Sequence, residues 1–135
     1  MAKKDKIIEL KLCNVLLEDN ANYPWLILVP RIDNAKNMLR FSMEQRLQVM
    51  REVALCEEVL AENFACDQTN IATADDEIDQ LAIHIVCRQK KDKNWPCLAW
   101  GTAAKHYKAE DKADMVNKIE KAIKIKMANE KYMQF

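Results

Sequence analysis

The stretch QLAIHIVCR at residues 80–88 alternates between two kinds of side chain, as a β-strand between two different surfaces does. One set is wholly apolar and belongs against a core: Leu81, Ile83, Ile85 and Cys87. The other set mixes polar and small residues: Gln80, Ala82, His84, Val86 and Arg88. We therefore predict a strand at 80–88 that packs its apolar face on the core and points Gln80, Ala82 and His84 toward a groove or solvent.

The flanking sequence predicts more strands and two helices. Residues 10–17 and 25–30 have strand composition, and the polar turn at 18–22 joins them as an antiparallel pair. Ser42, with Gln45 three residues later, forms a capping-box pattern that begins a long helix. The apolar positions of that helix are Met43, Leu47, Met50, Val53, Ala54, Leu60 and Phe64. Residues 68–73 indicate another strand and 114–127 a last helix. This order of elements is typical of the α+β class.

Length and charge narrow the class of protein. The 135 residues suit one domain. No apolar run reaches the roughly 18 residues that a membrane span needs, and the N-terminus leads into no apolar signal region. We therefore predict a cytoplasmic protein that does not bind membranes. A net charge of zero argues against general affinity for nucleic acid.

The cysteines and histidines do not form a metal motif. The five cysteines are Cys13, Cys56, Cys66, Cys87 and Cys97, at wide and irregular spacings. In an intracellular chain we expect all of them to be thiols that pack as small apolar residues. Only His84 and His106 accompany them, and a structural zinc site needs nitrogen or sulfur ligands in local pairs. We predict neither a metal nor a cofactor.

The 80–88 stretch resembles the strand of the histidine triad (HIT) family, which has the form His-φ-His-φ-His-φ-φ, where φ is apolar. Gln80 fits a bacterial branch that has Gln at the first triad position, and His84 fits the third. Ala82 stands where the middle histidine, the nucleophile, would be. Further matching motifs follow in the family's order: Asp19-Asn20, YPWLILVPR at 23–31, Asn70-Ile71-Ala72, Trp95-Pro96 and Trp100-Gly101. The similarity covers residues 10–103.

The resemblance implies a fold and an assembly. It implies a HIT-like antiparallel sheet with a long helix packed on it, within a single domain over 1–135 that has a helical C-terminal extension at 104–135. Family members are typically twofold dimers with the long helix and a neighbouring strand at the interface. A homodimer is therefore expected here too.

The resemblance also implies a purine nucleotide as ligand. Gln80, Ala82 and His84 occupy the catalytic positions, Asp19 or Asn20 would lie near the ribose, and Asn70 and Gln80 near the phosphate, which His84 would contact. Leu16 and Leu28 would face the base, and Trp95 belongs to the nucleotide-binding set. Where the family has a Gly-Asn turn before the strand, this chain has Asp75-Asp76-Glu77-Ile78-Asp79, whose carboxylates would crowd the approach of a phosphate.

Three functions remain open from the sequence. The first is a nucleotide-binding protein with little or no hydrolase or transferase activity, since an alanine methyl group cannot attack phosphorus. The second is an active phosphoramidase or dinucleotide hydrolase, whose chemistry is altered or whose Ala82 replaces a native histidine. The third is a non-enzymatic interaction module that uses Asp75, Asp76 and Glu77 as its recognition surface.

Overall fold

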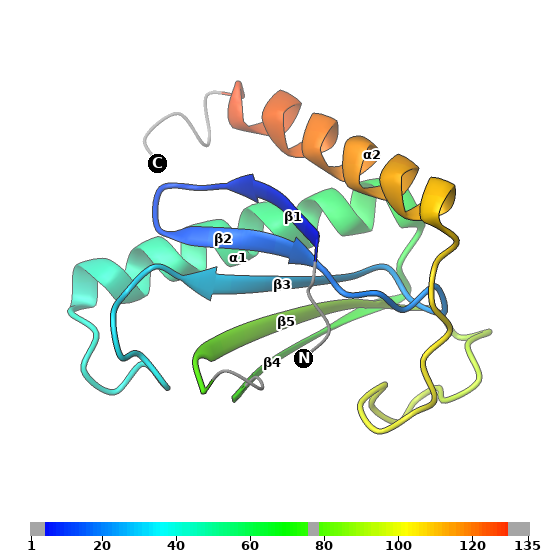
Figure 1. Cartoon of the computed structure of the whole chain (residues 1–135), viewed down its shortest axis with the longest axis horizontal. Coiled ribbons are helices and arrows are strands. Elements are labelled where there is room, and N and C mark those ends of the chain that lie inside the picture. The colour runs from blue at the N-terminus through cyan, green and yellow to red at the C-terminus, as the bar shows by residue number, and fades with distance from the viewer. Residues whose placement is uncertain (1–4, 76–78, 130–135) are drawn as a thin grey trace.

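The computed structural model describes residues 5–75 and 79–129, and its strands form one antiparallel sheet in the order β1-β2-β3-β5-β4. The strands are β1 (Asp5–Glu9), β2 (Cys13–Leu17), β3 (Trp25–Pro30), β4 (Gln68–Asp75) and β5 (Leu81–Arg88). Helix α1 (Met43–Phe64) crosses behind the sheet, and α2 (Ala109–Met127) runs along its β1 edge (Figure 1). The predicted α+β class, with a long helix on an antiparallel sheet and a C-terminal helix, is confirmed.

The elements differ from the sequence prediction at β1, at the start of β2 and at the start of α2, each for a physical reason. Strand β1 was not predicted, because its DKIIE sequence has only one buried side chain, Ile7, and its order comes from pairing with β2. Residues 10–12 turn back instead of extending β2, with Leu10 N–H donating to the Cys13 carbonyl at 2.8 Å. Helix α2 begins five residues before the predicted 114, because its first turn is polar and gives no apolar periodicity. Glu110 in that turn favours a helix start through the helix dipole.

The alternation of β5 divides the interior into two clusters. Its apolar set (Leu81, Ile83, Ile85 and Cys87) lies in the larger core, which also holds Val53, Cys56 and Leu60 of α1. On the other face, Ala82 and Val86 belong to a smaller cluster with Tyr23, Trp25 and Ile27. The expectation that Ala82 points toward a groove or solvent was wrong: it is 1% exposed, because this cluster encloses it.

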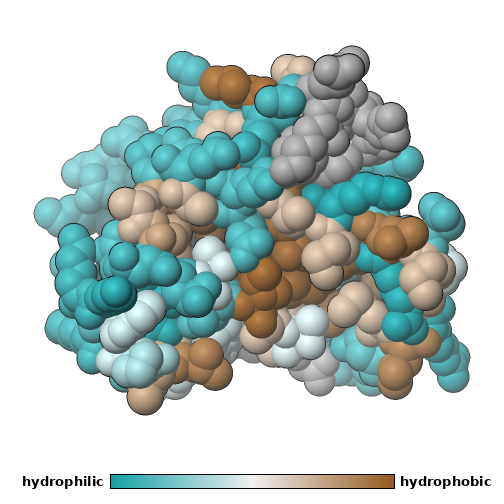
Figure 2. All heavy atoms as spheres, turned by 180° about the vertical axis from the view of Figure 1, so that it is seen from behind, coloured by the Kyte–Doolittle hydropathy of each residue, from teal (hydrophilic) through white to brown (hydrophobic). Residues whose placement is uncertain are grey.

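Helix α1 has an apolar stripe in addition to the face that it buries. Ser42 forms the predicted capping box with Gln45. Of the predicted apolar positions, Val53 and Leu60 are buried in the core, but Met43 (68% exposed), Leu47 (44%) and Met50 (62%) are not. Ile71 on the edge strand β4 is also 47% exposed. Seen from behind, apolar atoms gather over the middle and right of the molecule (Figure 2).

A buried carboxylate fixes the β1–β2 turn to α1. Glu52 is fully buried and accepts hydrogen bonds from the Cys13 N–H (2.7 Å), the Leu12 N–H (3.1 Å) and the Gln48 amide (2.6 Å). These hydrogen bonds replace those that the carboxylate makes with water in the unfolded chain and loses on burial. Burial, reinforced by the Glu52 charge, raises the pKa of the Cys13 and Cys56 thiols well above the usual range, so both remain protonated.

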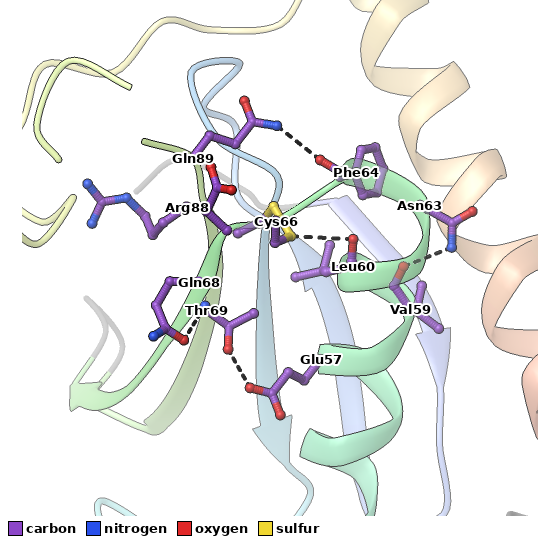
Figure 3. The surroundings of a disulfide bond; sticks show 12 residues. Glu57, Val59, Leu60, Asn63, Phe64, Cys66, Gln68, Thr69, Arg88 and Gln89 are labelled. Carbon is purple, nitrogen blue, oxygen red and sulfur yellow. Dashed lines mark hydrogen bonds between the residues drawn. A yellow bond between two sulfur atoms is a disulfide. The ribbon is translucent and has the colours of Figure 1, made fainter. Parts of the chain in front are cut away.

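Two of the cysteines are not thiols, which corrects the sequence prediction. Cys66, just after α1, and Cys87 of β5 form a disulfide across a Cα–Cα distance of 5.3 Å. Around it, the Gln89 side chain donates to the Phe64 carbonyl at 3.0 Å, and Thr69 of β4 donates to Glu57 of α1 (Figure 3). No local pattern in the sequence indicates this bridge, because its two cysteines are 21 positions apart and come together only in the folded chain. The free cysteines are Cys13, Cys56 and Cys97.

Neither helix of the described residues combines the length and the apolar character needed to cross a membrane.

Candidate functional site

His84 lies on the face of the sheet opposite α1 and is held by a tryptophan from the neighbouring strand. The β3–β5 register pairs His84 with Ile27, and Trp25 two residues earlier pairs with Val86. The side chains of Trp25 and His84 therefore point to the same face. The indole Nε1–H of Trp25 donates to Nδ1 of His84 at 2.9 Å.

Aromatic rings surround this hydrogen bond. Trp25 meets His84, Trp100 and Tyr23 edge to face, at centroid distances of 5.8, 5.1 and 6.3 Å. Trp100 also meets the His84 ring at 5.6 Å. Edge-to-face contacts at these distances are favourable. Trp100 arrives from the loop after β5, so the loop and two strands together fix the orientation of the imidazole.

A buried arginine holds Asn70 and the start of that loop. Arg88 is 1% exposed, and its Nη1 donates to the Asn70 side-chain oxygen at 2.9 Å. Its Nε and Nη2 donate to both carboxylate oxygens of Asp92, each at 2.9 Å, and its guanidinium lies over the Tyr23 ring. The hydrogen bond and charge of Arg88, with backbone bonds from Gln89 and Asn94, lower the pKa of Asp92. The same pairing raises the pKa of Arg88.

His84 and Asn70 are diagonal neighbours on one sheet face. Asn70 pairs with Val86 and Ala72 pairs with His84 in the β4–β5 register, and side chains at such diagonal positions are about 7 to 8 Å apart. One polar atom of each side chain accepts a hydrogen bond: His84 Nδ1 accepts from Trp25, and Asn70 Oδ1 accepts from Arg88. The other polar atoms, Nε2 of His84 and Nδ2 of Asn70, are therefore hydrogen-bond donors. Both groups are of the type that donates to anionic oxygens.

Of the other two triad positions, one lies in β5 and one immediately before it. Ala82 is two residues before His84 and offers only a methyl group inside the smaller cluster. Gln80 precedes β5, and its amide nitrogen donates to the Pro30 carbonyl at the end of β3 at 3.3 Å. The strand thus places the three positions in the expected series, with no nucleophilic atom at the middle one.

Asp19 and Asn20, which were expected near the ribose, bind the segment that leads into α2. Asp19 accepts hydrogen bonds from the Tyr107 backbone N–H at 2.9 Å and from His106 at 3.0 Å. The Tyr107 bond is the main cause of the lowered pKa of Asp19. Asn20 is buried, and its side-chain oxygen accepts from the N–H groups of Asn22 and Lys105. The β2–β3 turn is therefore bound to the segment that leads into α2.

The residues expected at the base are divided between the two faces. Leu28 is fully buried in the core beneath α1, because it pairs with Ile83 rather than His84. Leu16 packs against the smaller cluster on the His84 face, and Ile27 belongs to that cluster. Trp95 is half-buried in the loop after β5, where its N–H donates to the Asp92 carbonyl at 3.4 Å.

The acidic segment falls mainly outside the described residues. Residues 76–78 are not described, and Asp79 forms an exposed ion pair with Lys36 at 2.7 Å. Within residues 5–75 and 79–129, no group of His, Cys, Asp or Glu side chains is arranged to hold a metal ion.

Sequence reasoning placed His84 on this face but missed the residues that orient it. Trp25 was noted only as part of a matching motif, and Arg88 only as a member of the alternating set. Tyr23 and Asp92 had no assigned role. The available signal was the pairing of two apolar strands that both carry aromatic or polar side chains on one face. Without the register, no pattern tells that Trp25 reaches His84, 59 positions away.

The chain is similar to known proteins over most of its length. The family model described as "HIT domain" matches residues 1–91. A histidine triad protein from Bradyrhizobium japonicum is 32% identical, with a TM-score of 0.83, over 89% of this chain and 90% of that one. A histidine triad protein from Marinobacter aquaeolei is 30% identical, with a TM-score of 0.84, over 90% and 89%.

A more distant structure shares the fold alone. It is a hypothetical histidine triad nucleotide-binding protein from Sulfolobus tokodaii, 14% identical with a TM-score of 0.71, over 93% of this chain and 87% of that one. No curated protein matches the chain. The match of the family model to residues 1–91, together with the solved relatives, shows that this chain belongs to the histidine triad (HIT) family.

Proposed function

We propose that this protein binds purine nucleotides through the phosphate and turns them over slowly or not at all. The observation that carries the proposal is the pair of oriented donors, His84 Nε2 and Asn70 Nδ2, on one sheet face. Oriented N–H groups bind phosphate oxygens well, because hydrogen bonds to a charged acceptor are stronger than neutral ones. The fold agrees with a nucleotide ligand, since the Sulfolobus tokodaii relative is described as nucleotide-binding.

The lack of turnover follows from Ala82. An active family member would use a histidine at this position to attack the α-phosphorus and carry the nucleotidyl group. A methyl group has no lone pair to attack with. Loss of the nucleophile from a cooperative catalytic unit costs on the order of 10³ to 10⁶ in rate.

Calorimetric titration with adenosine and guanosine monophosphates, at low and moderate salt, tests the binding. We expect dissociation constants in the micromolar to low-millimolar range. The matched control is Asn70→Asp, which replaces an N–H donor with a carboxylate of nearly the same shape and should abolish binding. Absence of heat from the folded wild-type protein at both salt concentrations would refute the proposal.

Restoring the middle histidine tests whether the remaining site is still arranged for catalysis. We expect Ala82→His to gain hydrolysis of a nucleoside phosphoramidate, measured by product release, over a wild type that is nearly inert. Ala82→Gln, similar in length but without an imidazole, controls for the steric effect of filling the cluster. A folded Ala82→His protein that is as inert as wild type would show that Gln80, Asn70 and His84 are not placed for catalysis.

We also propose that the protein is a homodimer through α1 and β4. The support is the exposed apolar stripe of Met43, Leu47 and Met50 on α1, together with exposed Ile71 on the edge strand β4, which a Thr69–Glu57 hydrogen bond joins to the same helix. Exposed apolar patches of this kind are typical of protein interfaces.

A further inference from the structure

We propose that Trp25 is a positioning residue that holds His84 as a neutral ring with its hydrogen on Nε2, so that His84 serves the site as a donor and not as a base or nucleophile. The inference rests on the nucleotide-binding function proposed above and specifies how one of its contacts works. Its direct observation is the 2.9 Å hydrogen bond from Trp25 Nε1 to His84 Nδ1.

The chemistry of the indole determines the direction of this bond. An indole N–H donates a hydrogen bond and accepts none, so Nδ1 of His84 must offer its lone pair. A protonated imidazolium has hydrogen on both nitrogens and could not accept this bond. The bond therefore selects the neutral tautomer with hydrogen on Nε2.

Packing makes Trp25 a fixed partner. Its side chain is nearly buried, and its ring is held edge to face by Tyr23 on one contact and by Trp100 on another. Tyr23 is in turn covered by the Arg88 guanidinium, which is bound to Asp92 and Asn70. Rotation of the indole away from His84 would disrupt this whole set of contacts. The orientation of His84 is thus linked through Trp25 and Tyr23 to that of Asn70.

The tautomer decides what His84 can do. A nucleophilic or basic imidazole needs a nitrogen lone pair directed at its target. The Nδ1 lone pair is engaged by Trp25, and Nε2 carries a hydrogen and has no such lone pair. His84 therefore does not replace the histidine missing at Ala82. An Nε2–H group does suit a phosphate oxygen.

The two histidines of the chain allow a direct test without any ligand. Nδ1 of His106 faces the Asp19 carboxylate at 3.0 Å, so its neutral ring should carry the hydrogen on Nδ1, opposite to His84. Long-range ¹H–¹⁵N NMR at about pH 8, above the ordinary histidine pKa of about 6.5, distinguishes the two tautomers. We expect His84 Nδ1 to resonate as an unprotonated nitrogen, with His106→Gln assigning the signals. A protonated Nδ1 in His84 of the wild-type protein would overturn the inference even if no variant folds.

Two matched substitutions then test the role of the N–H group. Trp25→Phe removes the indole N–H but keeps an aromatic ring, and Trp100→Phe removes the other indole that contacts His84 but leaves the bond from Trp25 intact. In Trp25→Phe we expect a mixture of both His84 tautomers and a roughly three- to tenfold weaker affinity for adenosine monophosphate, as for loss of one oriented hydrogen bond. In Trp100→Phe we expect the wild-type tautomer of His84, because the bond from Trp25 remains, and a smaller loss of affinity than in Trp25→Phe.

The outcomes separate this inference from the proposed function. If the tautomer is as stated and wild-type protein binds no nucleotide, the proposed function fails and the assignment of His84 stands. If wild-type protein binds nucleotide and Trp25→Phe changes neither the ¹⁵N spectrum of His84 nor the affinity, the positioning role of Trp25 is refuted. Equal losses in both Phe variants would also refute it, because ring packing alone would then account for the effect.

Discussion

Arg88 is the residue on which the geometry of the loop after β5 depends most directly. It ends the alternating set of β5, and the same alternation that exposes His84 to the site brings Arg88 under the loop. Its long side chain is buried with its charge matched by Asp92, as buried charges require. Removing one member of such a pair leaves an uncompensated buried charge.

We predict that Asp92→Asn lowers the free energy of unfolding by about 2 kcal/mol or more at pH 7. The pKa of Asp92 is depressed by Arg88, so its contribution is fully present above the ordinary aspartate pKa of about 4 and is lost as the pH falls through the depressed value. The difference in free energy of unfolding between wild type and Asp92→Asn should therefore become smaller below about pH 4. Urea unfolding at pH 7 and in acid measures it.

Asp33→Asn is the control for this experiment, because Asp33 is exposed and has no hydrogen bond or ion pair with the part of the chain that the structure describes. It should leave the stability unchanged at both pH values. A constant difference between Asp92→Asn and wild type from neutral to acid pH would contradict the assigned role of the carboxylate.

For single residues, the sequence predicted which face of the strand a side chain lies on but not which side chains it contacts. The period of two in a strand is enough to group Ala82, His84 and Arg88. The bond from Trp25 to His84 depends on the β3–β5 register, and the bond from Arg88 to Asp92 depends on the conformation of a turn. The local sequence pattern predicted neither this register nor the conformation of this turn.

Among the elements, the disulfide joins the end of α1 to β5 and so connects the helix layer to the strand of His84. We predict that reduction lowers the free energy of unfolding by about 3 kcal/mol, the loop-closure effect expected for a bridge of this span. Urea midpoints with and without reductant measure the change. A thiol count on the denatured, unreduced protein should find three free thiols rather than the five of the sequence.

Two variants make that prediction specific. Cys66→Ser should have the same midpoint with and without reductant, and Cys97→Ser, which removes an exposed free thiol, should respond to reductant as wild type does. Five reactive thiols in the unreduced protein would contradict the bridge.

The elements that the sequence predicted well are those whose stability is local or whose apolar pattern is complete. The capping box of Ser42 and Gln45 marked the start of α1, and β3 and β5 were found within one residue. Strand β1 was missed because it has one buried side chain and owes its order to pairing with β2 and packing against α2. The first turn of α2 was missed because it is polar.

For the whole molecule, the proposed dimer makes a prediction about size in solution. Leu47→Glu places a charge in the exposed stripe of α1 and should convert a dimer to a monomer, as seen by sedimentation equilibrium. Ile125→Glu on α2 is the matched control, because Ile125 is similarly exposed and lies outside the stripe. A wild-type monomer, or a Leu47→Glu protein that remains dimeric, would rule out this interface.

The sheet order also has a consequence for how the molecule assembles. Three of the four strand pairings join strands that follow one another in the chain, and only β3–β5 reaches across α1 and β4. Closing that long loop costs more chain entropy than any other strand pairing of the sheet, so we expect the β3–β5 pairing to form after the three local pairings. The same pairing brings Trp25 to His84. A partly folded chain that holds only its hairpins therefore lacks the contact between Trp25 and His84, and under the proposed function a nucleotide would select the chains in which the sheet has closed.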